Sequence, residues 1–118
     1  MKKIIVITLM LLGILSVSGQ NNYYFKQAKE FQKEAEYYTK QALSNENNAD
    51  YYNKLARQYL KNADYHLRRK EYDKANIYQQ RVKVITERAK NYTRKAASAR
   101  KRAEYYLKKA SKFLERAK

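Results

Sequence analysis

A unit of fourteen residues, repeated along most of the chain, constrains the fold of this sequence more than any other feature. The clearest copies begin with two tyrosines, as in YYFKQAKEFQKEAE and YYLKKASKFLERAK. Full copies occupy residues 23–36, 37–50, 51–64, 77–90, 91–104 and 105–118. Residues 65–76 form one further copy that is two residues shorter. A fixed period of this kind predicts a fold built by repeating one structural element.

Each unit contains two heptads, and a small residue occupies one position, here called a, in nearly every heptad. The a positions hold Ala28, Ala35, Ala42, Ala49, Ala56, Ala63, Ala75, Val82, Ala89, Ala96, Ala103, Ala110 and Ala117. Three residues later, position d holds Phe31, Tyr38, Asn45, Tyr52, Tyr59, His66, Tyr78, Ile85, Tyr92, Ala99, Tyr106 and Phe113. Small residues at a and mostly large ones at d, among good helix formers and without proline, predict an all-α coiled coil of alanine and tyrosine with no β-strand.

The short copy breaks the heptad phase at one place. A continuous helix would rotate its apolar stripe out of line there, so the sequence predicts a turn near residues 69–72. The two arms would span about residues 22–69 and 73–118. Folding them antiparallel, with paired residue numbers that sum to 141, places Ala28 opposite Phe113. The predicted fold is therefore a long antiparallel helical hairpin.

The residues around this turn resemble the helix–turn–helix centre of a tetratricopeptide repeat. The similarity rests on Ala63, on KEYDKA at residues 70–75 and on Val82. It occurs once, has Lys70 where that family favours glycine, and does not recur at the family's period of about 34 residues. It supports a turn near residue 70 and does not indicate membership of the family.

Residues 44–48 leave a second arrangement open. Their sequence, SNENN, contains typical loop and cap residues and is a poor helix former. A kink there would preserve the hairpin, whereas a turn would give three helices at roughly 22–43, 49–69 and 73–118. The equal length of the two arms favours the hairpin, because half of the last of three helices would lack a partner.

The first nineteen residues have the features of a secretory signal peptide. Lys2 and Lys3 precede an apolar run from Ile4 to Leu15, and small residues lead up to Gly19. We expect a bacterial cell to export the chain to the periplasm or the medium, leaving residues 20–118 as a single all-helical domain. An uncleaved N-terminal anchor is the alternative, although the apolar run is shorter than the roughly 20 residues that span a bilayer.

Composition excludes several kinds of functional site. The chain has no Cys, one His and two Gly, and both glycines lie within residues 1–19. A disulfide framework, a Cys-ligated zinc and a histidine cluster are therefore excluded, as is a glycine-rich phosphate loop beyond residue 19. We expect no cofactor, no metal site and no enzymatic activity.

The charge of the chain is strongly positive. There are 27 Lys+Arg against 11 Asp+Glu, a formal charge of +16, of which +14 would remain without Lys2 and Lys3. Between Glu87 and Glu104 there is no acid, and the candidate anion-binding residues in this interval are Arg88, Lys90, Arg94, Lys95, Arg100, Lys101 and Arg102. Such a charge exceeds what solubility needs and costs stability through self-repulsion, so it favours binding of anionic lipid, an envelope polymer or nucleic acid.

Tyrosines recur at the position before d. They are Tyr23, Tyr37, Tyr51, Tyr65 and Tyr105. One interpretation is partial burial along the edge of the coiled coil, with the hydroxyl groups in water. The other is a row of aromatic platforms beside basic residues, able to stack on nucleic-acid bases, grip sugar rings or anchor in a membrane interface.

These features predict an exported, non-enzymatic, cationic helical interaction protein that binds an anionic envelope component or polyanion. The alternatives are a membrane-active or antimicrobial effector and a periplasmic chaperone-like clamp for a protein client. Position e follows d in the sequence and lies beside a around the helix. It holds Leu60, Leu67, Leu107 and Leu114. Because these leucines widen the apolar stripe, the sequence also predicts a homo-oligomer.

Overall fold

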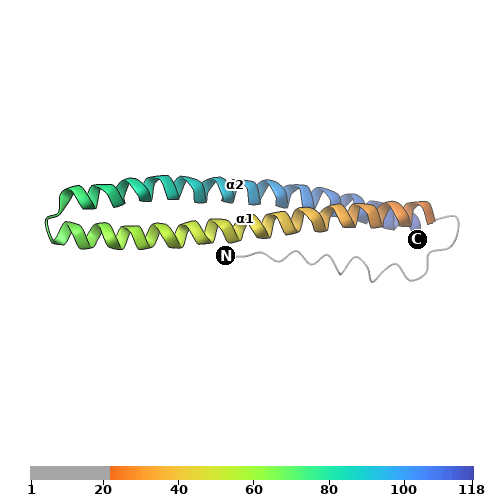
Figure 1. The fold of residues 1–118 in the computed structure, drawn as a ribbon. Coiled ribbons are helices and arrows are strands. Elements are labelled where there is room, and N and C mark those ends of the chain that lie inside the picture. Colours follow the sequence, from red (N-terminus) through yellow and green to blue (C-terminus); the bar gives the residue numbers. More distant parts are fainter. Residues whose placement is uncertain (1–21) are drawn as a thin grey trace. The chain divides into compact units, whose positions relative to one another are not determined.

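The computed structural model of the protein describes residues 22–118, which are all-α. Helix α1 spans Asn22–Arg68 and helix α2 spans Tyr72–Ala117, and the described residues contain no strand. The two helices pack against each other in opposite directions (Figure 1). The prediction of an antiparallel helical hairpin is confirmed. The predicted signal peptide lies outside the described residues.

Helix α1 continues without interruption through residues 44–48. The second turn considered for this stretch is absent, so the three-helix arrangement is wrong. Leu43 and Asn47 are exposed while Ala42 and Ala49 are buried, so the helical period of the stretch is preserved. Helix stability in proteins comes mostly from packing of one face, and here that packing outweighs the poor helix propensity of three asparagines.

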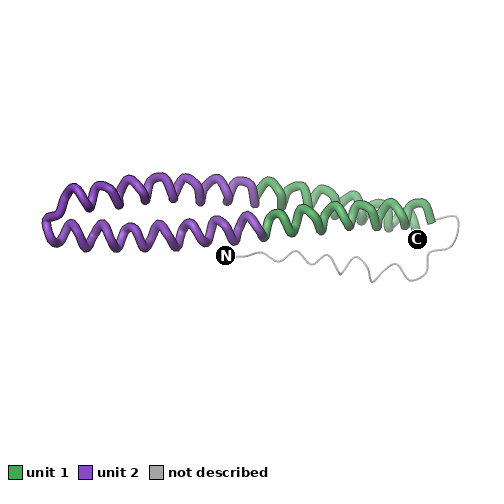
Figure 2. The backbone as a smooth tube through the Cα atoms, in the orientation of Figure 1, with its two compact units in different colours: residues 1–43, 97–118 green, residues 44–96 purple. Residues whose placement is uncertain are grey.

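The described residues fall into two compact units (Figure 2). One unit consists of residues 44–96 and contains the turn, and the other consists of residues 22–43 and 97–118. The division lies beside Asn45 and Ala99, the two d positions that have neither a ring nor a large aliphatic side chain.

Alanine forms the buried core of each unit. In residues 44–96 the buried a positions are Ala49, Ala56, Ala63, Ala75, Ala89 and Ala96. In residues 22–43 and 97–118 they are Ala28, Ala35, Ala42, Ala103, Ala110 and Ala117. No large side chain of the described residues is fully buried. Small residues at the contact let two helices approach closely, but each buried methyl group adds only about 0.8 kcal/mol.

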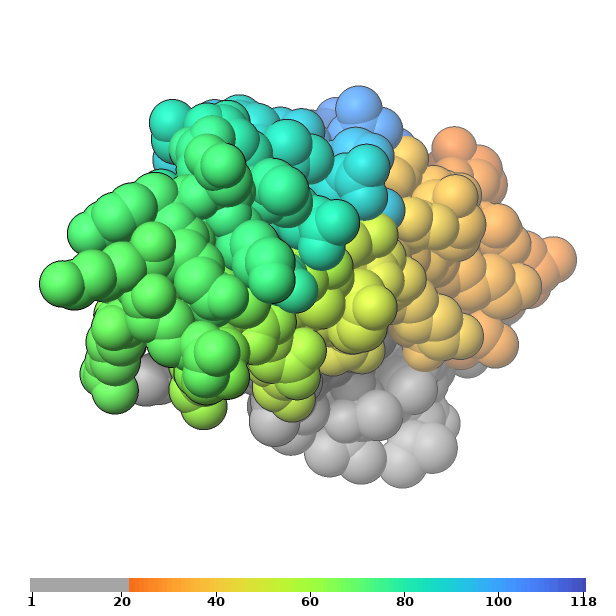
Figure 3. Space-filling view, turned by 60° about the vertical axis from the view of Figure 1, so that its left-hand side comes forward, coloured from red at the N-terminus to blue at the C-terminus, as the bar shows by residue number. Residues whose placement is uncertain are grey.

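The turn ends α1 with a left-handed residue. Lys70 has φ of 60°, its N–H donates to the carbonyl of Leu67 at 3.0 Å, and the N–H of Glu71 donates to the carbonyl of His66 at 2.9 Å. This pair of hydrogen bonds is a Schellman motif, in which glycine is usual at the position of Lys70. The side chains around the turn, coloured green, lie at the surface in Figure 3.

The carboxylate of Glu71 joins both sides of the turn. It accepts a hydrogen bond from Nδ1 of His66 at 2.9 Å and lies 3.2 Å from Nε of Arg69 and 3.7 Å from Nζ of Lys74. The hydrogen bond from His66, aided by the nearby cations, lowers the pKa of Glu71. The turn is thus held by side-chain contacts as well as by the backbone.

Replacing Lys70 with glycine should stabilise the hairpin. Removing the Cβ atom relieves a left-handed conformation that costs about 1–2 kcal/mol, and the added entropy of the unfolded chain offsets about 0.5–1 kcal/mol of that gain. We expect Lys70→Gly to raise the free energy of unfolding by about 0.5–1 kcal/mol, measured by urea denaturation. Lys70→Ala removes the same charge but keeps Cβ and should not stabilise. A gain of equal size in both variants would contradict this account.

Enlarging a buried alanine should destabilise the hairpin. Ala103 is fully buried, whereas Ala97 is exposed six residues earlier on the same helix. Overpacking a tight contact costs about 1–3 kcal/mol, so we expect that loss for Ala103→Leu in thermal or urea melts. Ala97→Leu adds the same side chain and should change stability by less than about 0.5 kcal/mol. Equal effects would show that the alanine contact is not tightly packed.

Candidate functional site

Aromatic rings from both helices meet along one edge of the unit formed by residues 22–43 and 97–118. From one end to the other, successive ring centroids are 6.0 Å apart for Tyr24 and Phe113, 5.2 Å for Phe113 and Phe31, 6.1 Å for Phe31 and Tyr106, and 5.8 Å for Tyr106 and Tyr38. The rings alternate between α1 and α2, and each is half-buried. We call this side of each helix pair, formed by its d positions, the aromatic edge.

The unit of residues 44–96 has a shorter version of the same edge. Tyr52 stacks on Tyr92 at 5.6 Å, while Tyr78 lies 5.9 Å from Tyr59 and stacks on His66 at 5.5 Å. Ile85 lies between these groups in the sequence of d positions and is buried. The row of rings is therefore interrupted where α2 has an aliphatic residue in place of an aromatic one.

These ring pairs refine the predicted packing. The sequence predicts alanines opposite rings at a residue-number sum of 141, and the observed ring pairs have sums of 144 or 137, on either side of that value. Positions a and d project about 60° apart around a helix. Since the alanines occupy the middle of the contact, the d side chains of both helices lie to one side of it and pack on one another.

The predicted platform tyrosines stand beside the rings of the aromatic edge. Tyr23, Tyr37, Tyr51, Tyr65 and Tyr105 are 62%, 56%, 60%, 55% and 50% exposed. Each makes an edge-on contact, at 5.1–5.4 Å between centroids, with the ring of the residue that follows it. They are thus anchored by the edge and present at least half of their surface to solvent, which agrees with partial burial and leaves their proposed stacking role a prediction.

Basic residues spaced seven apart on α2 lie over the rings of the aromatic edge. In residues 44–96, the guanidinium carbon of Arg81 is 5.8 Å from the ring centre of Tyr59, and that of Arg88 is 6.0 Å from Tyr52. Nζ of Lys95 is 5.3 Å from the ring centre of Tyr92, on α2 itself. These distances are within the range of cation–π interaction.

The other unit repeats this arrangement. Arg102 lies 5.4 Å from the ring centre of Tyr38 and donates a hydrogen bond to its hydroxyl at 3.3 Å. Lys109 lies 5.5 Å from Phe31, and Arg116 lies 6.0 Å from Tyr24. We call the set the cation ladder, consisting of Arg81, Arg88 and Lys95 in one unit and Arg102, Lys109 and Arg116 in the other.

Only part of the cation ladder is among the predicted anion-binding residues. Arg88, Lys95 and Arg102 belong to it. The remaining predicted bases are Lys90, Arg94, Arg100 and Lys101, and they lie outside the seven-residue spacing of the ladder. Sequence reasoning missed Arg81, Lys109 and Arg116. The signal that could have found them is a base three residues after each d position of the second arm.

Lys90 and Arg94 lie at another place on the same helix. They line a hollow of about 350 Å³ together with Asn53, Thr86, Ala89 and Thr93. Nη1 of Arg94 donates to the side-chain oxygen of Asn91 at 2.9 Å and lies 3.9 Å from Glu87. Its charge is therefore partly neutralised. Of the other predicted bases, Arg100 is half-buried and Lys101 is exposed.

The cation ladder belongs to α2 alone. The corresponding positions of α1, three residues after each d position, hold Gln27, Glu34, Gln41, Asn48, Leu55 and Asn62, and none of these is a base. Acids pair with bases outside the ladder, for example Glu30 with Lys33 and Asp64 with Arg68. No ladder residue has an ion pair in the described part of the chain. Within residues 22–118, the ladder therefore presents positive charge without an ion pair of its own.

Comparisons with protein-family models, with curated proteins and with solved structures find no match to this chain. Neither α1 nor α2, the helices of the described residues, is long and apolar enough to cross a membrane. The assignment of a functional site therefore depends on the geometry and the charge of the chain itself.

The contact of Arg102 with Tyr38 should stabilise the hairpin measurably. An exposed cation–π pair contributes about 0.5–1 kcal/mol, so we expect Arg102→Gln to lower the free energy of unfolding by about that amount in urea. Lys101→Gln removes the same charge from an exposed neighbour and should leave stability within about 0.5 kcal/mol of the original. If the two variants lose the same stability, the ring contact of Arg102 has no energetic weight.

Proposed function

We propose that this protein is an exported, non-enzymatic interaction protein that binds polyanions through the cation ladder of α2. The observation that carries the proposal is the ladder itself: bases at a seven-residue spacing, each held over a ring and none paired with an acid of the described residues. Export rests on the predicted signal peptide at residues 1–19.

Ring contacts prepare these side chains for an anionic ligand. A guanidinium stacked on an aromatic face keeps its N–H groups directed outward in its own plane, where they can take a phosphate or carboxylate in two hydrogen bonds. The restricted side chain also loses less conformational entropy on binding than a free one. The guanidinium carbons of Arg81, Arg88, Arg102 and Arg116 lie 5.3–6.0 Å from the centres of the rings they cover, which supports this role.

The spacing of the ladder suits an extended polymer. Seven residues of α-helix advance about 10.5 Å, so the three ladder residues of one unit extend over about 21 Å. Like charges held in a row repel one another, and the repulsion costs stability in the free protein. A ligand with many anionic groups removes that repulsion and displaces the small ions around both partners, which supports a polymeric or surface-bound anion over a single small one.

Binding to inorganic polyphosphate tests this proposal, because that probe is a polyanion with neither nucleobases nor lipid. We expect the protein to bind it, and the affinity to fall about tenfold or more between about 50 and 200 mM salt. Fluorescence anisotropy of an end-labelled polyphosphate would measure this. Absence of binding, or an affinity that does not change with salt, would contradict the proposal.

Two variants of equal charge separate the ladder from net charge. One replaces Arg102, Lys109 and Arg116 with glutamine, and the other replaces the exposed Lys26, Lys40 and Lys101. We expect the first to lose several-fold more affinity than the second, with helix content checked by circular dichroism. Equal losses would show that the overall charge binds the polyanion and the ladder does not. Dye release from anionic vesicles and suppression of client aggregation would reveal the effector and clamp activities instead.

A further inference from the structure

The aromatic edge of residues 44–96 has a hollow beside Tyr59. It has a volume of about 320 Å³ and is lined by Tyr59, Gln80, Arg81, Val84, Ile85 and Arg88. Tyr59 contacts the ring of Tyr78 on one side, but toward Ile85 it meets an aliphatic side chain in place of a ring. The shorter side chain leaves the space unfilled, so the hollow has an apolar floor.

Two ladder arginines stand at this hollow. Arg81 lies over Tyr59 and Tyr78, at 5.8 and 5.3 Å, and Arg88 lies over Tyr52 at 6.0 Å. No acid lines the hollow, and the nearest acid in the sequence, Glu87, lies 3.9 Å from Arg94. The hollow therefore combines two oriented cations with an apolar surface.

Exposed aliphatic side chains continue this surface along α2. Ile77 and Val84 are 52% and 55% exposed, and on a helix they alternate with Arg81 and Arg88 along one face, at intervals of four and three residues. Apolar side chains that alternate with basic ones on a helix surface are a feature of helices that lie on a lipid surface.

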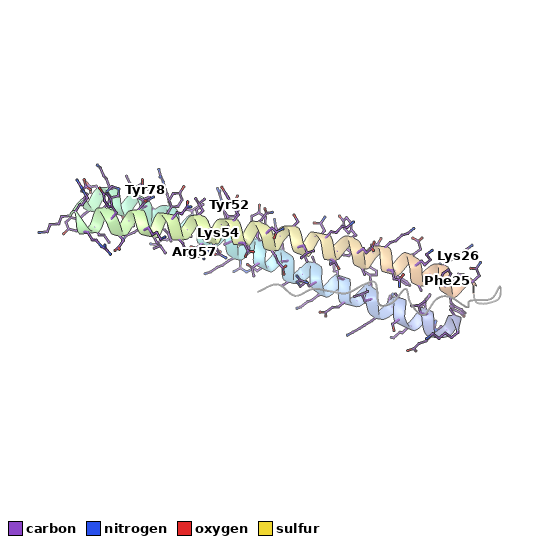
Figure 4. The ribbon with its side chains drawn as sticks, turned by 90° about the horizontal axis from the view of Figure 1, so that it is seen from below. Phe25, Lys26, Tyr52, Lys54, Arg57 and Tyr78 are labelled. Carbon is purple, nitrogen blue, oxygen red and sulfur yellow. The ribbon has the colours of Figure 1, made fainter. Side chains whose placement is uncertain are left out.

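Tyrosines of α1 border the same edge. Tyr51 and Tyr65 are exposed and stand edge-on against Tyr52 and His66. Tyrosine, with an apolar body and a polar tip, is enriched where a protein meets the boundary between hydrocarbon and water. In Figure 4, Tyr52 and Tyr78, the rings beneath the two arginines, lie at one edge of the ribbon, while Lys54 and Arg57 are labelled away from it.

We propose that this face of residues 44–96 binds the surface of an anionic phospholipid bilayer with the hairpin closed. Arg81 and Arg88 hold a lipid phosphate at the hollow, and Ile77 and Val84 enter the boundary between head groups and acyl chains. The proposal rests on the polyanion binding proposed above and names its ligand class. Two features favour lipid over a soluble polymer, namely the exposed aliphatic residues between the arginines and the apolar floor of the hollow.

Vesicle binding by the protein tests the proposal. We expect it to bind vesicles of mixed phosphatidylglycerol and phosphatidylcholine in a co-sedimentation assay, and not vesicles of phosphatidylcholine alone. Replacing Arg81 and Arg88 with glutamine should weaken this partition on the order of 20-fold, since each base near an anionic surface contributes roughly a factor of five. Replacing Lys54 and Arg57 with glutamine changes the net charge of the same unit equally and should weaken partition much less.

A second variant separates lipid binding from charge alone. Val84 is exposed, so Val84→Asn should preserve the fold, lower partition to the anionic vesicles several-fold and leave polyphosphate binding unchanged. The lipid face would be overturned if replacing Lys54 and Arg57 weakened vesicle binding as much as replacing Arg81 and Arg88. Unchanged vesicle binding by Val84→Asn would overturn it as well. In both cases the proposed polyphosphate binding would remain supported if it still depended on salt. Competition by free glycerol phosphate at the same concentration as vesicle phosphate would overturn it too and assign the hollow to a soluble phosphate. If the protein binds neither polyphosphate nor vesicles, both the lipid face and the proposed function are wrong.

Discussion

Alanine along the contact between the two helices is the constraint on which the rest of the structure depends. A methyl group at nearly every a position lets the helices come close, but it fills little space and buries little apolar area. No larger side chain of the described residues is fully buried to compensate. Each unit is therefore stabilised by many small contacts, and the side chains at d have to find their packing beside the contact instead of within it.

The aromatic edge follows from that displacement. Rings at d are too large for the space between the helices, so they lie to one side, half-exposed, and pack ring against ring from the two helices. Their outer faces remain open to a cation, and bases three residues after each d position of α2 cover them. The same side chains thus stabilise the hairpin and present its positive charge.

Departures from the repeat carry the specific features of the molecule. Ile85, where neighbouring heptads have a ring, leaves the hollow beside Tyr59. Lys70 stands where a helix end of this type usually has glycine, and it adopts a left-handed conformation. Next to it, the side chain of Glu71 binds His66 across the turn. Asn45 and Ala99, the d positions without a large side chain, lie where the two units divide. A perfectly regular sequence would have formed an edge without any distinct site.

The fold could be predicted almost entirely from the sequence, because heptad spacing determines which residues share a helix face and a break in that spacing locates a turn. Heptad spacing predicted the hairpin, its turn near residue 70 and the pairing of its arms. The helical state of residues 44–48 could not be predicted in this way, since their poor helix propensity is a local property and their helical state depends on packing against the partner helix.

The candidate site could be predicted only in part. Charge density along the chain indicated Arg88, Lys95 and Arg102, but it also indicated Lys90 and Arg94, which the structure places at a separate hollow. The sequence by itself determined that this protein is helical, paired and positively charged. Only the tertiary structure decided which bases lie over rings, because that depends on where the side chains of one helix stand against those of the other.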